Sequence, residues 1–251
     1  MLGIGCKRVL ERVLASIGKL EFAQSKFQEA KDVPCGGVLC ALPALIANGL
    51  LQHTKKYFEL PKGFYGLIHI FMLLAFMALS RVKSIEQLRY NSAGEWGNLL
   101  GLDRIPEVRT LRAKIQHLSE SGQVKEWSRV LSEDWMANNP ESAGVLYVDG
   151  HVRVYHGSQT PLPKRYVSRE RLCLRGMMDT WVNDRRGLPY FVVSTPFSAH
   201  ILGLLQNAHF VIPWLDHGIQ NILQTKNLWI PRSTDCVTIN KIAQKGCHAV
   251  V

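Results

Sequence analysis

The stretch GVLYVDGHVRVYHG, residues 144–157, decides the fold of the second half of the chain. Its first part, residues 144–148, is a continuous run of β-forming apolar residues, which is typical of a strand buried on both faces. Asp149-Gly150 is a dipeptide that favours a hairpin turn, and apolar and polar residues alternate over residues 151–156. The stretch therefore predicts a strand that ends at Asp149 and a second strand after the turn.

Two further strands are expected downstream. Residues 171–182 and 189–195 have strand character, and the polar run NDRRG at 183–187 predicts an antiparallel turn between them. Residues 198–222 have helical spacing, although Pro213 must kink or divide a helix there. From residue 223 onward no element is predicted.

The chain before Pro140 is helical. Apolar residues recur every three or four positions in residues 1–32, 107–120 and 124–137, which predicts amphipathic helices. Apolar and short helices are expected between these segments. The dipeptide Asn138-Asn139 before Pro140, where helical spacing gives way to strand patterns, predicts a domain boundary.

Composition indicates a globular protein with an anionic partner. The 251 residues are 47% hydrophobic and 20% charged, and the formal net charge is +10. Such a charge favours nucleic acid or an acidic membrane surface, although it also serves solubility alone. The most apolar run, residues 67–79, is shorter than the ~20 residues that cross a bilayer. We therefore expect no membrane partner. The start of the chain shows no secretory signal and the cysteines are scattered, so we expect reduced cysteines and a cytoplasmic location.

The cysteines do not predict a zinc site. Six are scattered along the chain, and only Cys35 and Cys40 lie close together. No second pair of cysteines or histidines follows them at ligand spacing.

Asp149 has two interpretations on local sequence alone. It belongs either to a tight turn or to a carboxylate that a buried strand holds rigidly at its end. The second arrangement suits polynucleotidyl transfer, in which oxygen ligands hold two Mg²⁺ ions roughly 4 Å apart. Further carboxylates must then converge from later elements.

A wider resemblance favours the second interpretation. Residues 144–193 resemble the opening of the catalytic domain in bacterial insertion-sequence transposases of the DDE type, and residues 60–115 resemble the region before that domain. The runs VDGHVRVYHG (148–157) and GLDRIPEVRTLR (101–112) are the most specific parts. The resemblance implies DNA transposition, DNA as partner, Mg²⁺ as cofactor, an RNase H-like domain, and Asp149 as the first catalytic and metal-binding acid.

We therefore expect an α+β protein with four parts. They are an N-terminal helix (1–33), a helical region with a DNA-binding role (34–140), a partial RNase H-like domain with an antiparallel or mixed sheet and helices (141–222), and a tail of uncertain structure (223–251).

The other two acids of the family pattern are missing. The family's fold implies a second Asp on a parallel strand and a Glu on a later helix. Neither Asp216 nor Asp235 follows a recognisable strand, and Glu170 is the last glutamate of the chain. Because one carboxylate cannot hold two hard cations for in-line displacement, we expect a truncated, inactive remnant whose Mg²⁺ site is incomplete.

Basic residues form two candidate DNA-binding sets. After Asp149 the set contains Arg153, Lys164, Arg165 and Arg169, which would follow a phosphate backbone or simply belong to a solvated loop. In the helical region, residues 84–90 and 107–120 with a short helix between them resemble a helix-turn-helix. There the residues expected to face DNA are Arg109, Arg112 and Lys114.

Three functions remain in competition. The first is a transposase or its remnant, the second is a non-catalytic DNA-binding protein that acts through its basic helical half, and the third is a helical scaffold with a protein partner. A homo-oligomer is a further expectation. A complete acidic triad would distinguish the first from the others. Salt-dependent retention on duplex DNA would support the second, and failure to bind DNA at low salt would leave the third.

Overall fold

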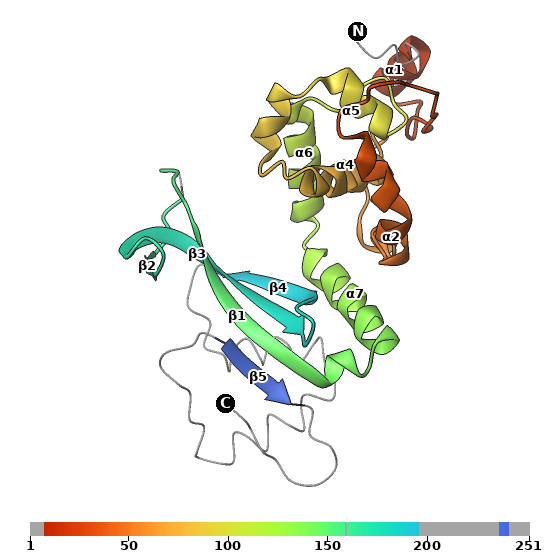
Figure 1. The fold of residues 1–251 in the computed structure, drawn as a ribbon. Coiled ribbons are helices and arrows are strands. Elements are labelled where there is room, and N and C mark those ends of the chain that lie inside the picture. The colour runs from red at the N-terminus through yellow and green to blue at the C-terminus, as the bar shows by residue number, and fades with distance from the viewer. Residues whose placement is uncertain (1–7, 159, 196–235, 241–251) are drawn as a thin grey trace, which may run out of the picture. The chain divides into compact units, whose positions relative to one another are not determined.

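The computed structural model describes residues 8–158, 160–195 and 236–240. The chain divides into two compact units, Met1–Trp127 and Ser128–Val251, and each is described by itself. The first unit is helical and the second contains the strands, so the expected α+β class is confirmed (Figure 1). The division between units lies within a helix, earlier than the boundary expected at Pro140.

Short helices build the first unit. They are α1 Val9–Ser16, η1 Gly36–Ala41, α2 Leu42–Ala47, α3 Thr54–Tyr57, α4 Leu67–Leu79, η2 Ile85–Tyr90, α5 Ala93–Leu99 and α6 Val108–Glu120, of which η1 and η2 are 3₁₀ helices. A further helix, α7 Val124–Asn138, begins in this unit and continues into the second.

The core of the first unit forms around α4. Ile70, Leu73 and Phe76 of α4 are fully buried, in one apolar cluster with Trp96 and Leu111. The apolar run at residues 67–79 is thus a core helix, as its length predicts. Within the described ranges, no helix has the length and apolar character needed to cross a membrane.

The N-terminal helix is shorter than expected. It ends at Ser16 instead of continuing to residue 32, and Gly18 adopts a left-handed φ of 70° just after it. The chain then runs extended and is held by backbone hydrogen bonds. The N–H of Ala23 donates to the carbonyl of Phe64 at 3.0 Å, and that of Lys26 donates to the carbonyl of Gly101 at 2.8 Å. These bonds replace those that a longer helix would make internally.

The expected helix over residues 107–120 is confirmed as α6. Val108, Leu111 and Leu118 are buried along one face, at the predicted spacing. The preceding α5 stops where Gly101 takes a φ of 65°, a left-handed conformation that glycine adopts without strain.

The second unit contains an antiparallel sheet. Its strands are β1 Val145–Val154, β2 Lys164–Val167, β3 Leu172–Asp184, β4 Pro189–Thr195 and β5 Cys236–Asn240, and the short 3₁₀ helix η3 Ser142–Gly144 precedes them. β1 lies between β3 and β5, and β3 pairs with β2 near its start and with β4 near its end (Figure 1). All of these pairs are antiparallel.

The hairpin expected at Asp149-Gly150 is wrong. β1 runs through this dipeptide without interruption, with Asp149 opposite Trp181 and Gly150 opposite Thr180. Because β3 is long enough to pair with β1 on both sides of Asp149, continued pairing satisfies more backbone groups than a turn would. The turn expected at residues 183–187 does form, and it joins β3 to β4.

One face of the sheet packs against α7. Leu146, Val148 and Val182 are buried there in a cluster with Met136 of α7. The helix expected at residues 198–222 lies outside the described residues, as does the tail apart from β5.

Candidate nucleic-acid interface

Asp149 lies in the middle of β1, on the face of the sheet opposite the buried cluster. Residues two apart on a strand share a face, so Asp149 shares its face with His151 and Arg153 and not with Leu146 or Val148. Asp149 is exposed. The expected position at the end of a strand is therefore wrong, although the expected central strand is present.

A second acid, Asp179, lies on the same face. It sits opposite His151 on β3, and therefore diagonal to Asp149 across the pair. Asp179 is buried, and its Oδ1 accepts hydrogen bonds from the hydroxyl of Ser194 at 2.6 Å and from the guanidinium of Arg153 at 3.1 Å. Sequence reasoning missed Asp179, although it is an isolated acid within the strand-like stretch MMDTWV, residues 177–182.

The described residues do not fit a two-metal centre. The Asp179 carboxylate is already occupied by Ser194 and Arg153, which leaves Asp149 as the exposed carboxylate of this face. In the described part of the chain, no group of three or more acidic, histidine or cysteine residues is arranged to hold a metal ion. One carboxylate is too few for two hard cations.

The β2–β3 hairpin, residues 164–175, exposes the strongest concentration of positive charge that the structure describes in this unit. Lys164 on β2 lies directly opposite Arg175 on β3, and both are exposed. Arg169 and Arg171 are exposed at the turn between the two strands. Tyr166 shares the face of Lys164 and is 60% exposed. Like charges directly opposite each other destabilise a strand pair, so an anion placed between them would stabilise it.

The other predicted residues of this set are less available. Arg165 lies on the opposite face of the hairpin, half-buried and across from Leu174. Arg153 is exposed on β1, but its guanidinium pairs with Asp179. Of the four cations predicted after Asp149, Lys164 and Arg169 thus belong to the exposed hairpin surface.

The basic residues of α6 differ in their surroundings. Arg109 is exposed in the first turn of the helix. Arg112 is exposed too, and it forms an ion pair with Glu86 of η2. The Glu86 carboxylate also forms an ion pair with Arg89, at 3.0 Å. Lys114 is half-buried, and its burial lowers the pKa of its amine. Arg109 is therefore the most accessible of the three predicted residues.

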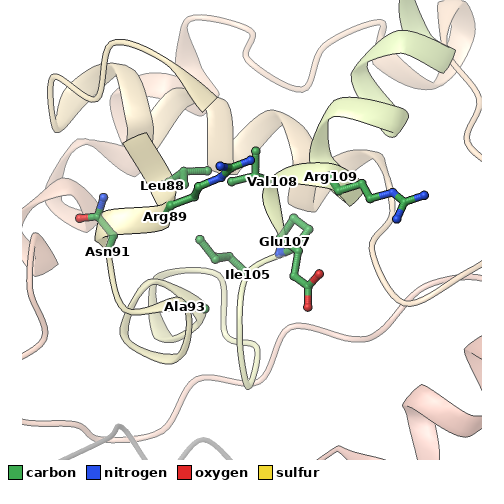
Figure 2. A pocket seen from close by; sticks show the side chains of 9 residues that line it. Leu88, Arg89, Asn91, Ala93, Ile105, Glu107, Val108 and Arg109 are labelled. Carbon is green, nitrogen blue, oxygen red and sulfur yellow. The ribbon is translucent and has the colours of Figure 1, made fainter. Parts of the chain in front are cut away.

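A shallow pocket of about 380 Å³ opens beside Arg109. Arg89 of η2 and Arg109 of α6 both line it, and Figure 2 shows Glu107 between these two basic side chains. Ile105 and Val108 supply apolar lining. The pocket therefore combines two guanidinium groups with an acid, and it lies between the helices of the expected helix-turn-helix.

Comparison with known proteins identifies the family. A family model described as "Transposase protein" matches residues 3–233. No curated protein and no solved structure matches the chain. The family match includes both the helical unit and the strands β1 to β4, so the expected resemblance to transposases is confirmed. Because the match covers nearly the whole sequence, the chain belongs to this family of transposase proteins.

Proposed function

We propose that this member of the transposase family binds DNA through the β2–β3 hairpin and does not cleave DNA strands by itself. The observation that carries the proposal is the placement of Lys164 opposite Arg175, with Arg169 and Arg171 at the turn. Closely spaced exposed cations bind a phosphate backbone without regard to sequence. Family membership indicates that the phosphate backbone is that of DNA, because transposases act on DNA.

Tyr166 adds an aromatic surface to the same hairpin. Its ring lies on the face of Lys164 and is largely exposed. Exposed aromatic rings beside cations stack on unpaired bases, and this contact is tolerant of sequence. The hairpin therefore suits a distorted or partly single-stranded segment of DNA at least as well as a regular duplex.

The sheet supports a link to the RNase H-like, DDE-type fold but not to its chemistry. β1, β3 and β4 form the three-stranded antiparallel arrangement with which such a domain begins, and Asp149 lies on its first strand. β5 runs antiparallel to β1, however, whereas the fold calls for a parallel strand there. Among the described residues this face carries a single exposed carboxylate, Asp149. We infer that the chain does not hold the Mg²⁺ ions needed for strand cleavage.

Binding is tested by fluorescence anisotropy with a labelled duplex and a partly single-stranded DNA. Lys164→Ala with Arg175→Ala should weaken binding by about thirtyfold at low salt, since two lost phosphate contacts of roughly 1 kcal/mol each remove about 2 kcal/mol. The matched control is Lys55→Ala with Lys62→Ala, which removes two exposed lysines of the other unit. Equal affinities of the hairpin variant and the wild-type chain would overturn this assignment.

Cleavage is tested by a Mg²⁺-dependent nicking assay. We expect no nicking by the wild-type chain or by Asp149→Ala. Nicking by the wild-type chain that disappears in Asp149→Ala would show that the catalytic acids are complete and would refute the inactive state.

A second candidate function is sequence recognition through α6. The first turns of this helix expose Arg109, Thr110 and Arg112, while Val108 and Leu111 anchor it in the core. This is the arrangement by which a recognition helix presents side chains to base edges. In a selection from random DNA, Arg109→Ala should lose any sequence preference while the hairpin variant keeps it; the reverse result would exclude α6.

A further inference from the structure

The N-terminal helix α1 is amphipathic with its polar side turned inward. Arg8, which precedes the helix, is buried, and its Nη2 donates a hydrogen bond to the carbonyl oxygen of Gly101 at 2.9 Å. A second donor of Arg8 binds the carbonyl oxygen of Gln24. Arg8 also pairs with Glu11, one turn along the helix. The charged groups at this end of α1 are thus bound within their own unit.

Arg12 completes the attachment of α1. Its Nε and Nη2 donate to the two carboxylate oxygens of Asp103 at 2.9 Å and 2.6 Å, so the pair is bidentate. The guanidinium also lies over the ring of Phe64, 4.0 Å from its centroid. Planar bidentate pairs and cation–π contacts both fix the direction of an arginine. The polar side of α1 therefore faces the body of the unit, and its rotation about the helix axis is set.

The apolar side of α1 is consequently exposed. The five aliphatic side chains on it, with their exposed fractions, are Val9 59%, Leu10 80%, Val13 52%, Leu14 40% and Ile17 57%. Surface helices ordinarily place such a stripe against the core. A contiguous exposed stripe of this kind marks an interaction surface.

We propose that this face of α1 pairs with the same face of a second copy of the chain. The stripe consists of aliphatic side chains, and the charged neighbours Arg8 and Arg12 are bound on the opposite side. Two identical faces therefore meet without like charges opposite each other, despite the net charge of +10. A face that complements itself is what a twofold-symmetric interface requires.

The area of the stripe also suits a dimer of modest affinity. Five half-exposed aliphatic side chains amount to on the order of 500 Å², so two copies would bury about 1,000 Å² together, near the lower limit for a specific interface. Leu10, Val13 and Ile17 follow the alternating spacing of three and four by which paired helices interlock. The expected product is a reversible dimer with a dissociation constant in the range of roughly 10–100 µM.

An acidic membrane surface fits α1 less well. A helix that lies in a membrane interface extends basic side chains from its polar face to the lipid headgroups. On α1 the two arginines are committed to Gly101 and Asp103, so they cannot make that contact without releasing the helix. Pairing with a second copy of the chain leaves both arginines bound to Gly101 and Asp103.

Sedimentation equilibrium of the nuclease-treated full chain in about 0.5 M salt, at which DNA bridging is suppressed, tests the proposal. We expect a monomer–dimer equilibrium whose dissociation constant rises about tenfold or more in Leu10→Ser with Ile17→Ser. The control, Leu188→Ser, removes a leucine of the other unit that is 60% exposed, and it should leave the equilibrium unchanged. A monomeric wild-type chain, or equal loss in the control, would overturn the proposal.

Two variants of opposite charge at Leu10 distinguish the loss of an interface from misfolding, because misfolded chains would not associate when mixed. Leu10→Lys and Leu10→Glu should each be monomeric, because like charges meet across the twofold axis, and an equimolar mixture should form a heterodimer. Failure of the mixture to associate would overturn the pairing of α1 with itself. Binding of the wild-type chain to vesicles of acidic lipid without self-association would assign the stripe to membranes instead.

Discussion

Arg12 and Asp103 form the ion pair that attaches α1 to the rest of its unit. The Asp103 side chain is only 14% exposed and accepts both hydrogen bonds of the arginine. Removing it leaves the Arg12 guanidinium partly buried without its counter-charge, which costs more than the loss of an exposed pair.

Asp103→Ala should therefore lower the free energy of unfolding by about 2 kcal/mol. The measurement is urea denaturation, with limited proteolysis at α1 as a local readout. Glu29→Ala removes an exposed carboxylate of the same unit and should change stability by less than about 0.5 kcal/mol. Equal stability of the two variants would show that the pair does not hold α1.

His69 is a buried, neutral histidine in the core helix α4. Its Nδ1 accepts the N–H of Gly66 at 3.1 Å, and its Nε2 lies 3.4 Å from the Ser25 hydroxyl. Burial, with smaller contributions from the positive charges of Arg8 and Lys114, lowers its pKa from 6.5 to about 4. The neutral form is the one that the fold requires.

Protonation of His69 should consequently lower the free energy of unfolding as the pH is lowered. The folded pKa lies below the unfolded one, so the stabilisation is complete above pH 6.5 and is lost as the pH falls towards 4. The loss is on the order of 3 kcal/mol. His69→Gln keeps an acceptor for Gly66 but does not titrate, so the stability difference between the two chains should shrink below pH 6.5. A difference independent of pH would contradict this assignment.

The position of Asp149 within β1 could not be predicted from the residues next to it. A local motif predicted a turn and a strand end, and the structure places Asp149 within a strand. A two-residue motif describes what the backbone can do, whereas pairing with β3 determines what it does. Asp179 was missed for a related reason: its position diagonal to Asp149 depends on the register between two strands.

At the scale of elements, the contact between α5 and the loop before α6 depends on Gly97. A Cβ at this position would lie 2.5 Å from the Cα and 2.6 Å from the N of Arg104. Both are backbone atoms, which cannot move aside as the end of a flexible side chain could. The glycine is thus required by the close approach of the chain, despite its low helix propensity.

Gly97→Ala should destabilise the protein by about 2 kcal/mol or more, although the same change in an open helix stabilises by up to ~1 kcal/mol. Thermal and urea unfolding give the value. Gly37→Ala is the matched control, since a Cβ there would meet nothing within 4 Å. A stabilised Gly97→Ala chain would show that the loop is free to move away from α5.

The helix α1 shows what periodicity can and cannot predict. The spacing of Val9, Val13 and Ile17 predicts a helix with an apolar stripe, and α1 forms there. The ordinary assumption would bury that stripe, but Arg8 and Arg12 find acceptors on the body of the unit and turn it outward. Those acceptors lie far along the chain, so the spacing of residues within the helix contains no information about them.

At the scale of the whole molecule, the net charge of +10 should favour the proposed association with DNA. We expect the logarithm of the DNA affinity to fall linearly with the logarithm of the salt concentration, with a slope of about 0.9 for each phosphate neutralised. Lys164→Ala with Arg175→Ala should reduce that slope by roughly 1 to 2. A flat salt dependence would exclude a phosphate-binding role.

Local periodicity and contiguous motifs were enough to predict the α+β class and the resemblance to transposases. They also predicted the positions of α4, α6, α7, β3 and β4. Four features follow only from tertiary contacts: the continuity of β1, the pairing of Asp179 with Ser194 and Arg153, the position of Lys164 opposite Arg175, and the outward orientation of the apolar stripe of α1. Each of these depends on the register or packing of segments distant in the chain, and no local pattern encodes which partner a backbone or side chain will meet.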